Sequence, residues 1–340
     1  MTTAAVIGTG LIGASVGMAL RSQGHRVVGW DPDPDEASEA LVRGAIDSIA
    51  RSRDDAIEGA DLIVLAAPPA AIIDHLADLP ITDALTIDVA GVKGPIVEAA
   101  ARLDRFVGTH PMAGREHGGA AHASPTLFRG ATWIVVPDGA SEEDLGIVSD
   151  LLEGTGANVT RMDAASHDDA VAAISHLPQS LAVQLVAHAA DDPVRLDLAA
   201  GSFRDLTRVA LSDERMWVEL LQANGPVVAD HLRRLGARLA DFADVIEGDD
   251  PDAVAAALRE ARTVRRTMAP PVVAIRIIIE DRPGELARVG AALADTRVDV
   301  RDLQLRHGRH GGGGVLTISV RPGEAEPLRD ALRDQGFELG

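Results

Sequence analysis

Three glycines near the N-terminus, Gly8, Gly10 and Gly13, constrain this chain more than any other feature of its sequence. A short apolar run over residues 4–7 precedes them, and a helical pattern over residues 11–23 follows. In a strand–turn–helix unit, this GxGxxG spacing permits a tight turn, lets a pyrophosphate approach the backbone and lets the helix pack closely. A glycine-rich structural turn has the same spacing, but the flanking strand and helix favour a dinucleotide-binding motif.

Asp31 ends the next apolar run, which covers residues 26–30. In dinucleotide-binding domains, a carboxylate at this place receives the ribose hydroxyls. The carboxylate would also repel a 2'-phosphate, so Asp31 favours NAD over NADP as the cofactor. Its alternative role is to cap a helix before Pro34. The expected cofactor-binding residues are Gly8, Gly10, Leu11, Ile12, Gly13 and Asp31.

The first half of the chain alternates short apolar runs with helix-like segments. This alternation predicts an α/β fold with a parallel Rossmann-type sheet built from βαβ units. The sheet is expected to end near residue 160. The expected strands cover residues 4–7, 26–30, 61–66, 85–89, 105–108 and 132–136.

From residue 167 the apolar residues recur at helical spacing, with Pro178 as an expected kink, so an all-α domain follows. A proline-containing linker over residues 268–271 ends it. Strands over 272–279, 298–305 and 315–320 and helices over 284–293 and 326–335 then predict a small α+β module in the order βαββα, with a glycine hairpin loop over 311–314. The expected domains cover residues 1–162, 163–268 and 272–340.

The charge balance excludes several classes of partner. A formal net charge of -20 disfavours nucleic acid and anionic membrane surfaces, because both require a basic footprint.

The chain has no cysteine, and we expect no metal site. The longest uncharged apolar run, residues 62–73, contains two prolines and is far shorter than the roughly 20 residues of a membrane helix. With no signal sequence at its start, we expect a cytoplasmic protein.

His110 lies in a segment, residues 108–116, that follows a predicted strand. Open α/β sheets bind ligands at the carboxyl ends of their strands. A histidine there can accept the proton of an alcohol that is being oxidised, because its pKa lies near neutrality. From position alone, a loop histidine that bonds only to backbone explains the residue equally well.

Arg204 and Arg208 lie one helical turn apart, with Asp205 beside them. The planar guanidinium group suits a carboxylate, and an acidic protein must gather its cations where it binds an anionic substrate. As an isolated pattern, a solvent-exposed charged helix face is the better interpretation.

Six segments, spread over all three expected domains, together resemble the prephenate dehydrogenase family with a C-terminal ACT domain. The segments are GTGLIG from Gly8, DVAGVK from Asp88, GTHPMAGREHGG from Gly108, SHLPQSLA from Ser175, GSFRDLTRVALSDERMW from Gly201 and DRPGELARV from Asp281. The resemblance implies an NAD-dependent oxidative decarboxylation of prephenate to 4-hydroxyphenylpyruvate in tyrosine biosynthesis. It also implies a homodimer formed through the helical domain.

The resemblance assigns roles to five residues. His110 matches the histidine that hydrogen-bonds the ring hydroxyl, and Arg208 matches the arginine that binds the ring carboxylate. Glu116 matches a carboxylate near the substrate side chain. Arg204 and Asp205 would position Arg208.

Two residues depart from the pattern of many relatives. Gly91 stands where they carry a serine whose hydroxyl assists the histidine, and Gln179 stands where they carry a second histidine. Gln179 is a candidate substrate-binding residue, so contacts to the substrate side chain can differ here. Arogenate, which has an amine in place of the ketone of prephenate, therefore stays an alternative substrate.

Asp281, Pro283 and Gly284 form an expected strand-to-helix turn in the C-terminal module. The glycine lets a ligand approach the backbone, and the helix N-terminus offers free amides to a carboxylate. The turn predicts an amino-acid effector site, and tyrosine is the expected effector. The alternative is that the module only supports dimerisation.

Two rival functions remain. A β-hydroxyacid dehydrogenase shares the two-domain plan, but it would present a catalytic lysine on the first long helix, and residues 167–190 contain none. An amino-acid-sensing protein with an inactive dehydrogenase domain is the other rival. Retention of His110, Arg208 and the complete glycine loop argues against it.

Overall fold

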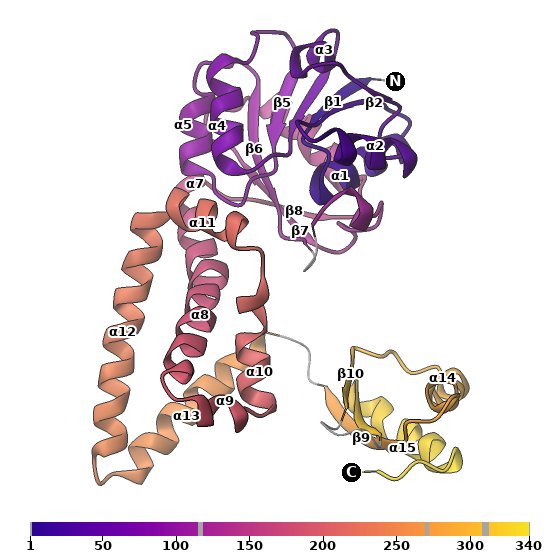
Figure 1. Ribbon diagram of the computed structural model, residues 1–340, viewed down its shortest axis with the longest axis vertical. Helices are drawn as coiled ribbons and strands as arrows, with labels where there is room; N and C mark the ends of the chain where they lie inside the picture. The colour runs from indigo at the N-terminus through magenta and orange to yellow at the C-terminus, as the bar shows by residue number, and fades with distance from the viewer. Residues whose placement is uncertain (1, 115–117, 269–271, 308–312, 340) are drawn as a thin grey trace. The chain divides into compact units, whose positions relative to one another are not determined.

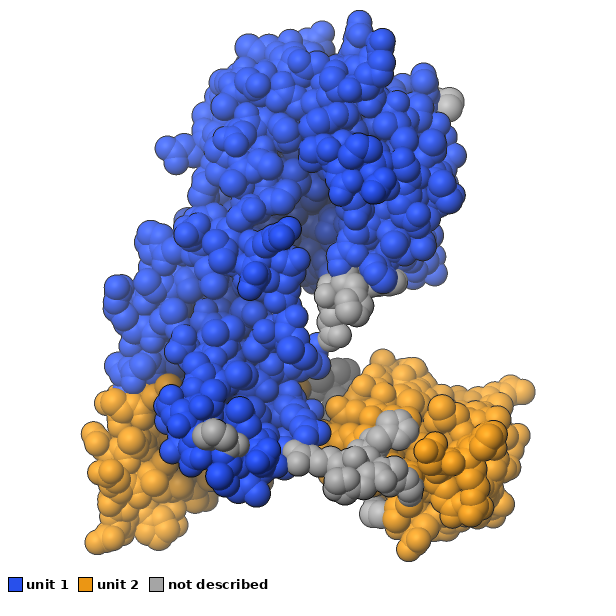
Figure 2. Space-filling model, viewed as in Figure 1, with its two compact units in different colours: residues 1–238 blue, residues 239–340 orange. Residues whose placement is uncertain are grey.

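The computed structural model describes residues 2–114, 118–268, 272–307 and 313–339. The chain divides into two compact units, Met1–Arg238 and Leu239–Gly340 (Figure 2). The first unit holds the large sheet and most of the helical segments. The second holds the last long helix and the small C-terminal sheet.

Eight strands among the described residues form one sheet in the order β3-β2-β1-β4-β5-β6-β7-β8 (Figure 1). The chain runs outward from β1 to β2 and β3, then returns to the other side of β1 at β4, which makes the β1/β4 junction a topological switch point. The strands are β1 (Thr3–Ile7), β2 (Arg26–Trp30), β3 (Ser48–Ile49), β4 (Leu62–Leu65), β5 (Leu85–Asp88), β6 (Phe106–Pro111), β7 (Thr132–Val136) and β8 (Asn158–Arg161).

The sheet is not wholly parallel, and this corrects the sequence-based expectation. Strand β7 runs antiparallel to β6, whereas the other neighbouring pairs are parallel. A parallel neighbour requires a long crossover, usually a helix packed on the sheet. Between β6 and β7 the described chain has only the short 3₁₀ turn η1 (Ala120–His122), so the strand returns in the opposite direction.

Helices cover both faces of the sheet because successive strand residues point to opposite sides. In β1, Val6 joins one apolar core, with α1, α2 and α6, and Ile7 joins the other, with α3, α4 and α5. The prediction of an α/β fold with a nucleotide-binding sheet is confirmed. The helices are α1 (Leu11–Ser22), α2 (Pro34–Val42), α3 (Arg53–Ile57), α4 (Pro69–Asp78), α5 (Gly94–Ala100) and α6 (Glu142–Glu153).

The helical segments begin directly after β8. Pro178 lies at the start of α8, and the preceding residues, Ala172–His176, form a π-helical turn, η2. Proline has no N–H to donate and its ring crowds the carbonyl group four residues earlier, so a local widening of the helix relieves both problems. The segments are α7 (Ala164–Val171), η2, α8 (Leu177–Ala190), α9 (Pro193–Asp197), α10 (Gly201–Thr207), η3 (Arg208–Leu211), α11 (Glu214–Ala223), α12 (Gly225–Glu247) and α13 (Pro251–Thr267).

One described helical stretch, Ala164–Ala190, is long and apolar enough to cross a membrane by length and composition. Its first half carries buried polar side chains, among them His167, Asp168 and His176, which bond to other parts of the same unit. Such contacts are those of a central helix in a folded domain. We therefore place the chain among soluble proteins.

The second unit contains a sheet whose described strands run in the order β10-β11-β9, all antiparallel. The expected βαββα order is confirmed, but the middle strand begins at Asp302 instead of residue 298, because Arg297 turns the chain with a φ of 51°. The expected loop over 311–314 lies partly outside the described residues. The elements are β9 (Val273–Ile279), α14 (Glu285–Thr296), β10 (Asp302–His307), β11 (Gly314–Val320), η4 (Pro322–Glu324) and α15 (Ala325–Asp334).

Candidate active site

The glycine loop connects β1 to α1 at the switch point of the sheet. Gly8 has a φ of 92°, and a Cβ atom there would lie 2.4 Å from the carbonyl oxygen of Ala66. A Cβ on Gly13 would lie 1.9 Å from the oxygen of Gly8. Neither position therefore accepts a side chain.

Gly10 caps the N-terminus of α1 with no side chain over the helix amides. A Cβ at Gly10 would meet no described atom within 4 Å, so open space lies beside these amides. An uncapped helix N-terminus of this kind suits a phosphate group. Leu11 and Ile12 begin α1; Leu11 is buried, and Ile12 is partly buried against the core.

Asp31 follows β2, and its carboxylate is oriented by three hydrogen bonds. The Thr9 backbone amide donates to Oδ2 at 2.6 Å, the Thr9 hydroxyl donates to the same oxygen at 3.3 Å, and the Asp33 amide donates to Oδ1 at 2.9 Å. A carboxylate has about four acceptor positions. Asp31 can therefore still receive ribose hydroxyls, and the loop and carboxylate together fit a dinucleotide.

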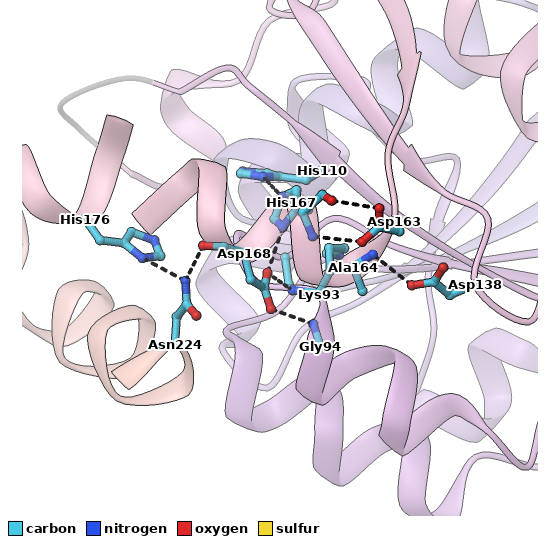
Figure 3. A network of polar contacts seen from close by, with 12 residues as sticks. Lys93, Gly94, His110, Asp138, Asp163, Ala164, His167, Asp168, His176 and Asn224 are labelled. Carbon is cyan, nitrogen blue, oxygen red and sulfur yellow. Dashed lines mark hydrogen bonds and ion pairs between the residues drawn. The ribbon is translucent and has the colours of Figure 1, made fainter. Parts of the chain in front are cut away.

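His110 is the second-last residue of β6, at the carboxyl end of the strand. Its Nδ1 lies 2.8 Å from Nε2 of His167, and Nδ1 of His167 lies 2.8 Å from Oδ1 of Asp168 (Figure 3). The two imidazole rings meet edge to face, with centroids 5.1 Å apart. His110 is thus the end of a three-residue hydrogen-bonded chain.

Asp168 is anchored on the opposite side by α5. The backbone amides of Lys93 and Gly94 each donate to one of its carboxylate oxygens at 2.7 Å. The Asn224 side-chain amide donates to the Asp168 backbone carbonyl at 2.8 Å (Figure 3). These bonds tie the start of the helical segments to the sheet.

Burial and nearby cationic groups determine the charge state of the site. Burial lowers the pKa of His110 well below its ordinary value of 6.5, and His167, Lys93 and His176 lower it further. Burial alone would raise the pKa of Asp168, but hydrogen bonds from His167 and two backbone amides outweigh it, and the pKa is lowered. A neutral His110 imidazole can accept a proton, and the Asp168 carboxylate is linked to it through His167.

A second polar cluster lies beneath β6. Lys93 and Asp88 form an ion pair whose side chains are both fully buried. Lys93 Nζ also donates to the Thr109 carbonyl oxygen at 2.6 Å, and the Trp133 indole donates to the Thr109 hydroxyl at 3.0 Å. The cluster holds the residue that precedes His110.

Gly91 faces the other nitrogen of the same histidine. A Cβ at Gly91 would lie 3.7 Å from His110 Nε2, and 3.0 Å from a methyl group of Leu220. A serine at this position would place its hydroxyl beside His110 and would crowd Leu220, whereas the glycine has no side chain there.

The remaining predicted residues lie on the helical segments. Gln179 is buried in α8, and its Oε1 has no hydrogen-bond partner among the described residues. Arg204 and Asp205 are exposed on α10. The helix ends at Thr207, and Arg208 begins the 3₁₀ turn η3, so the two arginines do not share one continuous α-helix as expected.

Glu116 lies outside the described residues.

The sequence analysis did not identify four residues of the site: Asp88, Lys93, His167 and Asp168. Their sequence signals were weak: Asp88 and Lys93 lie in a quoted motif without an assigned role, and His167 marked only the start of a helical pattern. Their partners are distant in the sequence.

The glycine loop, the Asp31 carboxylate and the His110 imidazole lie at the carboxyl ends of strands in one sheet. This combination defines a dehydrogenase that uses a nicotinamide dinucleotide.

Comparison with known families identifies the chain more closely. The nucleotide-binding domain of prephenate dehydrogenase matches residues 16–161, and its dimerization domain matches residues 163–260. The ACT domain matches residues 273–337. The chain belongs to the prephenate dehydrogenase family and is an NAD-dependent oxidoreductase.

Individual relatives agree with this assignment. The chain is 32% identical to a prephenate dehydrogenase of Lactococcus lactis, covering 96% of this chain and 95% of the relative. It is 29% identical to one of Bacillus subtilis, covering 94% and 92%. A crystal structure of the A. aeolicus prephenate dehydrogenase with hydroxyphenyl propionate and NAD+ superposes with a TM-score of 0.74 at 27% identity, covering 79% of this chain and 99% of that chain. The Synechocystis arogenate dehydrogenase superposes with a TM-score of 0.71, also at 27% identity, covering 78% of this chain and 100% of that chain.

Proposed function

We propose that this chain converts prephenate to 4-hydroxyphenylpyruvate by NAD-dependent oxidative decarboxylation, a step of tyrosine biosynthesis in the cytoplasm. The observation that carries the proposal is His110, a neutral histidine oriented by His167 at the carboxyl end of β6. It belongs to the same sheet edge as the glycine loop.

His110 Nε2 accepts the proton of the ring hydroxyl. The glycine loop and Asp31 would hold NAD, which would supply the acceptor for the hydride that leaves the carbinol carbon. Cleavage of the ring–carboxylate bond then releases carbon dioxide, and its electron pair makes the ring aromatic. His110 returns its proton to the ring oxygen, so the reaction consumes and releases no net proton.

The substrate-binding residues are part of the proposal. Arg208 binds the ring carboxylate, and Arg204 and Asp205 position it. Glu116 and Gln179 contact the side chain of the substrate.

Arogenate is the second candidate substrate, and Gln179 is the reason. Its buried Oε1 is a hydrogen-bond acceptor without a partner among the described residues, which suits the ammonium group of arogenate. Its Nε2 donors could instead serve the ketone of prephenate.

Steady-state kinetics with both substrates, each with NAD and NADP, test these assignments. We expect turnover of prephenate with NAD, and His110→Asn should lower kcat by about 10² to 10⁴ while the Kd for NAD stays nearly unchanged. A His110→Asn variant with a normal kcat would remove His110 from the reaction. Turnover of neither substrate by the unaltered chain would refute the proposed function.

We also infer an amino-acid effector site in the ACT domain, with tyrosine as the effector. Gly284, with a φ of 95°, precedes α14, whose first amides have no side-chain cap, and Asp281 and Pro283 are exposed beside it. Tyrosine should inhibit the full chain, and Gly284→Val should weaken this inhibition because a bulky residue blocks the backbone. If tyrosine inhibits the Gly284→Val variant as strongly as the unaltered chain, the inhibition comes from tyrosine at the active site instead.

We also propose that the chain forms a homodimer through its helical domain. The family match calls residues 163–260 a dimerization domain, and apolar side chains such as Leu198, Leu206 and Leu211 are 75%, 68% and 91% exposed. Light scattering after gel filtration should give twice the 35.5 kDa of one chain. The domain limits 1–162, 163–268 and 272–340 stay a prediction.

A further inference from the structure

We propose that His167 and Asp168 are positioning residues for His110, which hold one tautomer of its ring and share the proton that it takes from the substrate. The inference rests on the proposed function and extends it. It starts from the order of donors and acceptors along the hydrogen-bonded chain in Figure 3.

Asp168 determines the first tautomer. Its Oδ1 accepts from the Lys93 amide and its Oδ2 from the Gly94 amide, and these bonds favour the anion. An anionic carboxylate can only accept hydrogen bonds, so His167 must carry its proton on Nδ1.

The second tautomer follows from the first. His167 Nε2 is then an acceptor, and the neighbouring atom, 2.8 Å away, is His110 Nδ1. His110 must therefore carry its proton on Nδ1 and present an unprotonated Nε2 on the side of Gly91. That nitrogen is the one that the proposed reaction needs as a base.

The same chain stabilises the proton once His110 has taken it. Lys93 and His176 both disfavour a positive charge on His110, and Asp88 is already paired with Lys93. When Nε2 gains the substrate proton, the Nδ1 proton can move to His167 Nε2, where the Asp168 anion balances the charge. The reverse transfer returns a proton to the ring oxygen.

Replacement of Asp168 by asparagine separates its structural role from its effect on the histidines. Asp168 links α5 to α7, and an asparagine could still accept one of the two backbone bonds there. Oδ1 of Asp168 accepts from both the Lys93 amide and His167 Nδ1. An asparagine with its oxygen in that place still accepts from His167 but carries no negative charge to balance a proton on the histidines. In the flipped orientation its amide donates to His167 Nδ1, which moves that proton to Nε2 and forces His110 into the wrong tautomer.

The test compares Asp168→Asn and His167→Asn with Asp169→Asn in the full chain. Asp169 is the neighbouring exposed carboxylate and bonds to His231, so it is a matched control. We expect kcat to fall by about 10² to 10⁴ in the first two variants, as when the aspartate that orients a catalytic histidine is replaced. KM for prephenate and the Kd for NADH should change by less than about twofold.

The pH profile separates positioning from structure. Without the Asp168 anion, protonation of the His110–His167 pair is less favourable, so the acid limb of kcat should move to lower pH in Asp168→Asn. In the unaltered chain, the ¹⁵N resonances of the His110 ring should show that Nδ1, not Nε2, carries the proton. Thermal melting checks folding, and His167→Asn keeps the α5 anchor if Asp168→Asn fails to fold.

Several outcomes would overturn the proposal. Normal kcat in His167→Asn, or a loss of kcat with an unmoved acid limb in Asp168→Asn, would reduce these residues to structural links. A loss of the same size in Asp169→Asn would point to general destabilisation. If the unaltered chain turns over neither prephenate nor arogenate, the proposed function fails, whereas an active chain with unaffected variants refutes only the positioning role.

Discussion

The ion pair between Lys93 and Asp88 provides a sharp test of how β6 is held in place. Both side chains are 0% exposed. Lys93 donates to the Thr109 carbonyl at 2.6 Å, and Asp88 accepts from the Ala90 and Thr109 amides at 2.8 and 3.2 Å. Burial raises the pKa of Asp88 and lowers the pKa of Lys93, and each partner counteracts the other's shift. Each residue therefore depends on the other to stay charged.

We expect Lys93→Met to lower the free energy of unfolding by about 3–5 kcal/mol, because removal of one partner leaves a buried charge without compensation. This corresponds to roughly two to three and a half orders of magnitude in the ratio of folded to unfolded chains. The double variant Lys93→Met/Asp88→Asn should be more stable than the sum of the two single losses predicts, because neither charge remains.

Urea denaturation followed by tryptophan fluorescence measures the effect, since Trp133 bonds to Thr109 within this cluster. Arg43→Met is the control: it removes an exposed pair with Glu39, four residues away on one helix, and should cost less than about 0.5 kcal/mol. A loss for Lys93→Met no larger than that of the control would refute the reasoning.

Three further predictions concern cofactor, substrate and pH. Asp31→Ala should raise kcat/KM with NADP relative to NAD, because it removes the carboxylate that repels a 2'-phosphate; an unchanged ratio would contradict this role. Arg208→Ala should raise KM by the equivalent of about 2–5 kcal/mol if Arg208 pairs with a desolvated carboxylate, and an unchanged KM would place it outside the substrate site. Burial lowers the pKa of His110 and His176, so the unfolded chain binds more protons below about pH 6.5. Denaturation at about pH 7, 6 and 5 should therefore show falling stability, and a flat profile would be inconsistent with these shifts.

Local patterns were enough to predict most of the sheet and the nucleotide loop. The strands Arg26–Trp30 and Thr132–Val136 have the expected bounds, because a buried strand and its flanking turns are encoded by adjacent residues. Part of the glycine requirement is local for the same reason, because a Cβ on Gly13 would meet the oxygen of Gly8, whereas the approach of Ala66 to Gly8 is a tertiary contact. The order βαββα of the C-terminal module was also readable, although the αL residue Arg297 shifted one strand boundary.

The direction of β7 and the environment of His110 depended on tertiary contacts. The sequence identified His110 as a candidate base but left a loop histidine equally plausible, because its partner His167 is 57 residues away and the Lys93 anchor of Asp168 is 75 residues from it. Hydrogen bonds over such separations depend on how α5 and α7 dock against the sheet. The sequence alone therefore determined the cofactor loop and the class of fold, since these are properties of contiguous segments. Only the tertiary structure decided which nitrogen of His110 faces Gly91 and which faces His167, because that depends on donors and acceptors that folding brings together.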